Sequence, residues 1–251
     1  MSSPKRLARI AGLLYLIVGV FGGFALGYVK PLVYVPGDAV TTAANVAANA
    51  GLVRISVVAD LLQATVFVFL AMVLYVLLKD VNRSAARAMV VLVAIATTMM
   101  CLSEVFQFGA LLVSGDASYV AAFGAAGSSA LVGLLFDMYH YGLLMAQIFF
   151  GLWLIPLAYL AYKSGMFPKA LSLVLVVGGI SYLIDTVLAF LAPDLSRQVH
   201  GVLGIAPAIA EISTVAYLLV KGVKSTPKTA SSRVAVPVAP LVTARQVAGD
   251  G

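Results

Sequence analysis

The chain alternates between long apolar runs and short segments that hold most of its charged residues. A helix needs about 20 apolar residues to cross the hydrocarbon core of a bilayer, which is about 30 Å thick. Six runs reach that length, at residues 7–29, 51–78, 86–113, 129–162, 170–191 and 199–221. The pattern therefore predicts an all-α fold: a polytopic membrane bundle of six transmembrane helices within residues 1–221.

Two segments outside these runs have a distinct pattern. Residues 222–251 are rich in Pro, Ser, Thr, Val and Ala with scattered charges, which predicts a disordered cytoplasmic tail. Between the first two runs, Pro36-Gly37 predicts a turn, and Asp38 or Thr41 is placed to cap a short helix that follows. We interpret that helix as a structural elbow, with a lid as the alternative.

The composition supports a membrane location. Of 251 residues, 62% are hydrophobic and 10% are charged, whereas soluble domains carry about 25% charged residues. The lipid bilayer is therefore the expected partner of most of the surface. The net charge of +6 does not indicate nucleic acid, because the basic residues border apolar runs. The single cysteine, Cys101, excludes an internal disulfide and a multi-cysteine metal site.

Lys and Arg are distributed unevenly between the two sides of the predicted bundle. Of the 16 basic residues, 13 lie on the side that carries both termini, and the other side holds Lys30, Arg54 and Arg197. Cytoplasmic segments carry the excess of Lys and Arg in multi-pass proteins. Both termini are therefore predicted to be cytoplasmic, in a multi-pass protein of the cell membrane.

The first run carries glycines at four-residue spacing: Gly19, Gly23 and Gly27. Such a ridge allows another helix to approach closely. We interpret it as a packing seam within the bundle, and a dimer interface is the alternative.

Five carboxylates lie within the predicted spans, one in each span from the second to the sixth: Asp60, Glu104, Asp137, Asp185 and Glu211. His140 and Arg54 belong to the same spans. Ionisable groups within spans are rare because their burial in lipid costs several kcal/mol. At a rise of 1.5 Å per residue, the first four acids lie at a common depth of roughly 12–16 Å in the outer half. Glu211 lies deeper.

These seven residues are the candidate ligand- or proton-binding site. Polar or small residues recur three or four positions from each acid, such as Gln107 beside Glu104, so the acids are predicted to face a polar, outward-facing cavity. Clustered acids must be partly protonated or balanced by cations, unless they form only a structural network. A metal site built from Asp60, Asp137, His140 and Asp185 would favour a hard divalent cation such as Mg²⁺, Ca²⁺ or Mn²⁺.

Several segments together resemble a bacterial multi-pass membrane family known as domain of unknown function 4386. The stretches that carry the resemblance are Arg9-Ile10-Ala11-Gly12-Leu13-Leu14-Tyr15, Pro36-Gly37-Asp38-Ala39 with Arg54, Val58-Ala59-Asp60-Leu61-Leu62, Tyr119-Val120-Ala121-Ala122-Phe123, Asp137 with His140-Tyr141-Gly142, Phe149-Phe150-Gly151-Leu152, Tyr162-Lys163-Ser164-Gly165 and Gly179-Ile180-Ser181-Tyr182-Leu183-Ile184-Asp185. The resemblance extends from about residue 9 to residue 223 and implies a bacterial membrane location and a helix bundle. It implies no activity.

Three functions remain compatible with these observations. The leading hypothesis is proton- or cation-linked binding or transport of a small molecule that enters from outside. The second is an intramembrane metal-dependent hydrolase acting on a lipid, with Asp137 and His140 on the metal or as general base. The third is a membrane sensor or assembly factor. No phosphate-binding loop or serine nucleophile elbow is present, and the identity of the ligand and the oligomeric state stay open.

Overall fold

The structure is a computed structural model, and its description covers residues 3–224. Within that range it is almost entirely helical and contains no strand. Its elements are α1 (Pro4–Gly22), η1 (Gly23–Val29), α2 (Lys30–Val33), α3 (Ala39–Ala48), α4 (Ala50–Leu78), α5 (Arg83–Gly115), α6 (Ala117–Ser164), α7 (Lys169–Leu191), α8 (Pro193–Leu203) and α9 (Ile205–Val220). The part of the predicted tail that follows residue 224 lies outside the described residues.

The prediction of six membrane-spanning segments is confirmed by six helical segments that are long and apolar enough to cross a bilayer. Their bounds are Pro4–Val33, Ala50–Leu78, Arg83–Gly115, Ala117–Ser164, Lys169–Leu191 and Pro193–Val220. Two of them are interrupted. Gly124 adopts φ 72° and ψ 166°, which breaks α6 near its start, and a turn at Gly204 separates α8 from α9. The 16 residues of α9 measure about 24 Å, so α8 must supply the remaining length of the sixth span.

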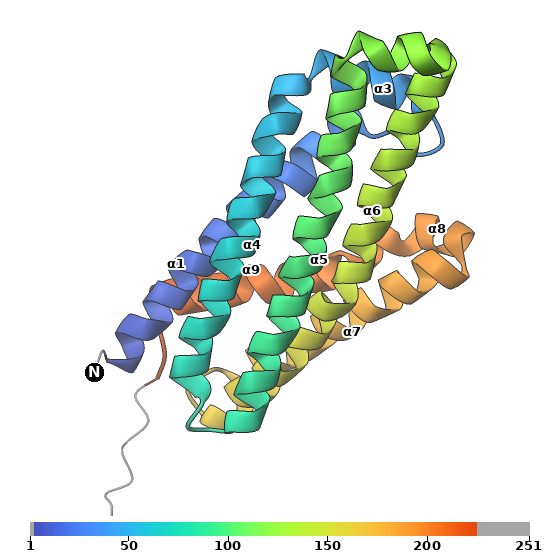
Figure 1. Cartoon of the computed structure of the whole chain (residues 1–251). Coiled ribbons are helices and arrows are strands. Elements are labelled where there is room, and N and C mark those ends of the chain that lie inside the picture. The colour runs from blue at the N-terminus through green and yellow to red at the C-terminus, as the bar shows by residue number, and fades with distance from the viewer. Residues whose placement is uncertain (1–2, 225–251) are drawn as a thin grey trace, which may run out of the picture.

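The six spans form a closed ring. Successive neighbours around it are α1, α4, α5, α6, α7 and α9, and α9 packs back against α1. In Figure 1, α4, α5 and the long part of α6 run side by side, while α7 and α9 are steeply inclined to them. This inclination separates α8 from the top of α4 and α5. A ring of this kind has an interior that lipid does not reach, which is where polar side chains are expected.

The two ends of the ring differ in their connections. At the N-terminal end, Lys224 donates its backbone N–H to Met166 O at 3.1 Å, and Gly222 lies against Lys5. At the other end, which we call the α3 end, Asp38 caps α3 through a 2.9 Å bond from the Thr41 amide. The predicted cap is therefore present, and α3 packs on α5 and α6.

Two apolar clusters fill the ring, one toward each end. The larger cluster, at the N-terminal end, joins α1, α4, α5, α6, α7 and α9 and includes Leu70, Leu74, Leu78, Met89, Trp153, Leu154 and Leu157. The smaller cluster lies at the α3 end and includes Tyr34, Val46, Met100, Phe136 and Tyr139. Polar side chains gather between and beside these clusters.

The prediction that Gly19, Gly23 and Gly27 form a packing seam is wrong for the described residues. A Cβ atom added at any of the three would meet no atom within 4 Å. Close helix contact occurs instead where Gly151 of α6 faces Gly179 of α7, since a Cβ on Gly151 would lie 2.7 Å from Gly179 O. Four-residue spacing alone does not show which face of a helix turns inward.

Candidate functional site

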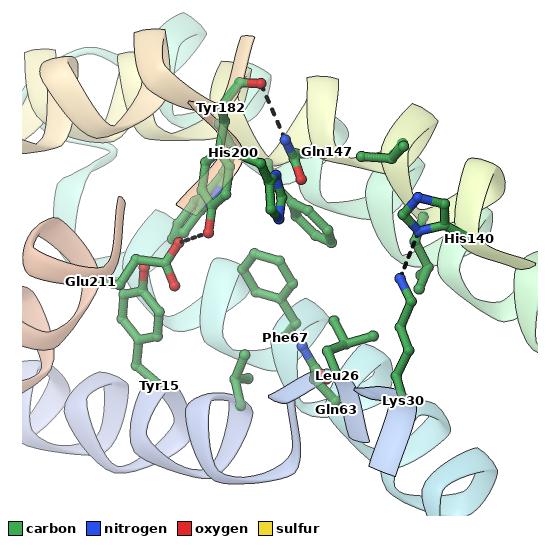
Figure 2. Close-up of a pocket in the computed structure, with 15 residues that line it drawn as sticks. Tyr15, Leu26, Lys30, Gln63, Phe67, His140, Gln147, Tyr182, His200 and Glu211 are labelled. Carbon is green, nitrogen blue, oxygen red and sulfur yellow. Dashed lines mark hydrogen bonds between the residues drawn. The ribbon is translucent and has the colours of Figure 1, made fainter. Parts of the chain in front are cut away.

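A cavity of about 280 Å³ lies inside the ring. It is lined by Tyr15, Val18, Leu26, Lys30, Gln63, Phe67, His140, Leu143, Leu144, Gln147, Phe150, Trp153, Tyr182, His200 and Glu211. Figure 2 shows that these side chains come from elements far apart in the sequence and converge on one space. We call this space the interior cavity.

A second cavity of about 310 Å³ adjoins the first toward the α3 end. The two share His140, Leu144 and His200 as lining residues, and the second is also lined by Pro36, Pro193 and Arg197. Pro36 and Pro193 belong to the connections at the α3 end. The two spaces therefore lie one behind the other between that end and the ring interior, with both histidines where they adjoin, and we call them together the path. Each approaches the lower limit of typical ligand pockets, which span about 300–1,000 Å³.

Lys30 and His140 form the first polar contact of this path. The π-helix η1 leads directly into α2, so that Lys30, the first residue of α2, turns toward the interior. Its Nζ lies 2.8 Å from His140 Nδ1. A lysine ammonium has only donors, so His140 accepts through Nδ1 and is neutral when Lys30 is charged. The same Nζ lies 5.7 Å from the centre of the Tyr139 ring, in a cation–π contact.

His200 is held by the second polar contact. Its Nδ1 lies 2.9 and 3.0 Å from the two carboxylate oxygens of Asp185. Gln147 Nε2 donates to the same carboxylate at 2.8 Å, and Asp185 itself is buried. This arrangement makes Nδ1 the donor and leaves His200 Nε2 without a partner among the described residues. A carboxylate in this position fixes the orientation of the ring and the nitrogen that carries the proton.

The deep end of the interior cavity carries hydrogen-bonding atoms without partners. Tyr182 donates its hydroxyl to Glu211 Oε1 at 3.1 Å. Tyr15 Oη at this end is buried and has no hydrogen-bond partner in the described structure. The same holds for Gln63 Oε1, which lies nearer Leu26 and Lys30 (Figure 2). Both residues line the cavity. Buried polar groups are normally paired, so these two atoms are unsatisfied acceptors or donors in the wall of the cavity.

The structure distributes the seven predicted site residues over four places. His140 and Glu211 line the interior cavity, and Asp185 contacts it through His200 and Gln147. Asp60 and Glu104 face each other between α4 and α5, behind Tyr139. These five residues lie in or beside the ring interior, but they do not form a single cluster.

Asp137 and Arg54 lie apart from this interior. Asp137 accepts a 2.5 Å hydrogen bond from Tyr34 Oη and lines a separate shallow cavity with Asp38 at the α3 end. Burial, together with this bond to Asp137, raises the pKa of Tyr34, so the phenol remains a donor at neutral pH. Arg54 is exposed and lines neither cavity of the path. The predicted partnership of Arg54 with the acids is therefore absent from the described structure.

The side chains predicted as metal ligands do not converge. Among residues 3–224, no three His, Cys, Asp or Glu side chains lie close enough together to hold a metal ion. Each of the four has a different polar partner: Tyr139 for Asp60, Tyr34 for Asp137, Lys30 for His140, and Gln147 with His200 for Asp185. The divalent-cation site predicted from these four residues is not formed.

Two site residues were missed by the sequence analysis. The sequence pattern places Lys30 only among the basic residues of the side opposite the termini, and it gives His200 no role. The available signal was their rarity, because Lys30 is one of three basic residues on its side and His200 is one of two histidines. The hydropathy pattern shows neither the rotation of a helix about its axis nor the π-helix at η1 and the turn at Gly204. The direction of the Lys30 and His200 side chains could therefore not be predicted from it.

Comparison with known proteins assigns the chain to a family but does not assign it an activity. No curated protein and no solved structure matches it. The model of one family, described as a domain of unknown function (4386), matches residues 10–222. That match covers most of the chain and the helical ring from Ile10 of α1 to Gly222. The resemblance seen in the sequence is confirmed, and the protein belongs to the family of domain of unknown function 4386.

Proposed function

We propose that the protein binds a small molecule that enters the ring from the outer side of the membrane, and that this binding is linked to protons or cations. The observation that carries the proposal is the path of two adjoining cavities that meet at His140 and His200. The α3 end carries Lys30, Arg54 and Arg197, whereas the N-terminal end is far richer in Lys and Arg. The positive-inside rule therefore supports an outward-facing path.

The lining supports a ligand that is both apolar and polar. Phe67, Phe150 and Trp153 supply aromatic surface. Lys30 and His200 stand near the entrance, and Tyr15 and Glu211 stand at the deep end. Ligand pockets combine apolar walls with a few polar groups that fix orientation. A small amphipathic molecule with a hydrogen-bonding group at its deep end fits this lining best.

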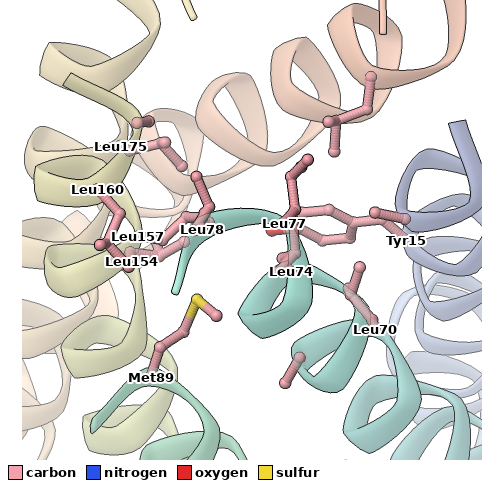
Figure 3. Close-up of a cluster of buried hydrophobic side chains, with 14 of the residues drawn as sticks. Tyr15, Leu70, Leu74, Leu77, Leu78, Met89, Leu154, Leu157, Leu160 and Leu175 are labelled. Carbon is pink, nitrogen blue, oxygen red and sulfur yellow. The ribbon is translucent and has the colours of Figure 1, made fainter. Parts of the chain in front are cut away.

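The apolar cluster at the N-terminal end supports binding more directly than passage. Figure 3 shows Tyr15 and a group of leucines meeting across the ring, with Leu154 and Leu157 of α6 opposite Leu74 and Leu78 of α4. These side chains are almost fully buried, so the ring is packed below the cavity. Transport would require this packing to separate. A metal-dependent lipid hydrolase has no support from the described residues, because their candidate ligands are dispersed.

Ligand-induced stabilisation of the purified protein in lipid nanodiscs tests the proposal. The probes are small amphipathic carboxylates, amines and zwitterions, each added over a range of concentrations. A ligand that binds only the folded state raises the melting temperature in proportion to the logarithm of its concentration above Kd. We expect at least one probe class to do so.

A matched pair of variants locates the binding. Leu144 lines both cavities of the path, so Leu144→Trp should fill it and abolish the shift. Leu102 is exposed on the outside of the ring, so Leu102→Trp should retain it. No shift with any probe class, or an equal shift in both variants, would contradict the proposal.

A further inference from the structure

We propose that Asp60 and Glu104 form a closed proton site between α4 and α5, in which Glu104 is protonated and donates to ionised Asp60. Neither residue lines the interior cavity or its neighbour toward the α3 end. The proposal therefore stands independently of whether a small molecule binds there, and it assigns a location to a proton that the protein holds at neutral pH.

The two acids are enclosed by the ring. Asp60 is 1% exposed and Glu104 is 3% exposed. Their carboxyl groups lie within hydrogen-bonding reach of each other. One helical turn nearer the α3 end, Gln107 Nε2 donates to Ser56 Oγ at 3.3 Å, so a second polar pair joins the same two helices. Both pairs are buried.

The site has more acceptors than donors. Tyr139 donates its hydroxyl to Asp60 Oδ2 at 3.4 Å, and Ser56 donates its own hydroxyl to Val53 O. The buried atoms left without a partner are Asp60 Oδ1, both carboxylate oxygens of Glu104 and Gln107 Oε1. Each of these four is an acceptor. Two ionised carboxylates in this setting would be adjacent like charges with little solvation, and one proton supplies the missing donor.

The asymmetry of the pair assigns the proton. Asp60 already accepts a hydrogen bond from Tyr139, which stabilises its charged form. Glu104 accepts none from the described residues, so its charged form has no such stabilisation. The proton therefore belongs on Glu104, and its carboxylic O–H donates to Asp60 Oδ1. Two carboxyl groups that share one proton in this way are a known solution for adjacent buried acids.

The neighbouring charges agree with one proton. Lys30 of α2 faces Asp60 across the Tyr139 ring and is hydrogen-bonded to His140. Cys101, on the same helix as Glu104, is the remaining titratable group beside the pair. The Lys30 ammonium and one proton balance the carboxyl groups of Asp60 and Glu104. The Cys101 thiol, the Tyr139 phenol and the His140 ring stay neutral. The cluster is then uncharged overall, which a site enclosed by apolar helices requires.

Infrared spectroscopy of the full-length protein in nanodiscs tests this assignment, because a protonated carboxyl group has a C=O stretch separate from that of a carboxylate. We expect a protonated-carboxyl band from Glu104 at neutral pH. Glu104→Gln should lose this band. Asp60→Asn removes the adjacent negative charge and leaves the Lys30 ammonium unbalanced, so the Glu104 band should weaken as well. Asp80→Asn, in the loop after α4, is the control and should leave it unchanged.

Isotope labelling provides a readout in which both members of the pair, Asp60 and Glu104, are left unchanged. Glu104 and Glu211 are the two glutamates of the chain. Labelling glutamate carboxyl carbons with ¹³C in a Glu211→Gln background should therefore shift the Glu104 band to lower frequency, whereas labelling aspartate should not. A protonated band that moves with aspartate label would overturn the assignment to Glu104. A Glu104 without a protonated band, in a protein whose melting temperature rises with Na⁺, would show a cation site in place of the proton.

Discussion

The two ends of the helix ring use the same six spans in different ways. At the N-terminal end, leucines, methionine and aromatic residues from all six spans meet in one packed cluster. Toward the α3 end, the spans separate around two cavities and carry Lys30, His140, Asp185 and His200 on their inner faces. The first region holds the ring together, and the second provides chemistry.

The difference follows from how membrane helices associate. Lipid tails are as apolar as leucine, so helices gain from close packing and from satisfied polar groups rather than from burial alone. The N-terminal end relies on packing. The α3 end relies on side-chain pairs such as Tyr34–Asp137, together with the connections α3 and α8. Substitutions in the two regions should therefore have effects of different size.

The largest effect is expected from truncation in the packed cluster. Leu157 is 2% exposed, and Leu157→Ala should lower the free energy of unfolding by about 2–5 kcal/mol through the cavity it leaves. Leu173 of α7 is 65% exposed, so Leu173→Ala should change it by less than about 0.5 kcal/mol. Reversible unfolding in mixed micelles measures both. Equal losses would mean that the cluster does not hold the ring together.

A smaller loss of stability is expected where Gly151 of α6 packs directly against Gly179 of α7. In Gly151→Ala, the new Cβ would lie 2.7 Å from Gly179 O, which is a backbone atom. The helices must separate, at a cost of about 1–3 kcal/mol. Gly19→Ala is the matched control, because its Cβ meets nothing within 4 Å and alanine favours helix. Thermal unfolding that ranks these two substitutions in the opposite order would contradict the observed packing.

At the α3 end, removal of one hydroxyl should have a modest effect. Tyr34→Phe deletes the donor to Asp137, and the partly exposed pair should lose about 0.5–1.5 kcal/mol. Tyr28 is exposed, and no hydrogen bond of its hydroxyl is described, so Tyr28→Phe should be neutral. Chemical unfolding of both variants compares them. A loss as large as that of Leu157→Ala would remove the contrast between the two ends.

The smallest effect is expected from the cap of α3 and depends on pH. Hydrogen bonds from Thr41 lower the pKa of Asp38 in the folded protein. Its carboxylate therefore stabilises α3 at any pH above its ordinary pKa, and this stabilisation is lost as the pH falls through the lowered value. Protection factors of α3 amides should fall over that range in the wild type, with α7 amides as an internal reference. Asp38→Ala should show lower protection at neutral pH and no such pH dependence.

The sequence alone was sufficient for features that depend on local composition. Six apolar runs become six membrane-length helices, because in lipid the backbone must satisfy its hydrogen bonds within each segment. Asp38 caps α3 because the cap is a contact between residues three positions apart. The three-residue spacing of Glu104 and Gln107 predicts a common helix face, and both side chains are buried.

Only the tertiary structure decided which of these groups meet. Tyr182 lies three positions before Asp185 on α7 but donates to Glu211 of another helix, and Asp185 is held by His200 from α8. Lys30 reaches the interior because η1 precedes it, and the glycine ridge turns away from the ring. The rotation, tilt and interruption of each helix are set by packing against its neighbours. The hydropathy of a run gives the position of a residue along its own span, but it does not fix the rotation of that helix relative to its neighbours.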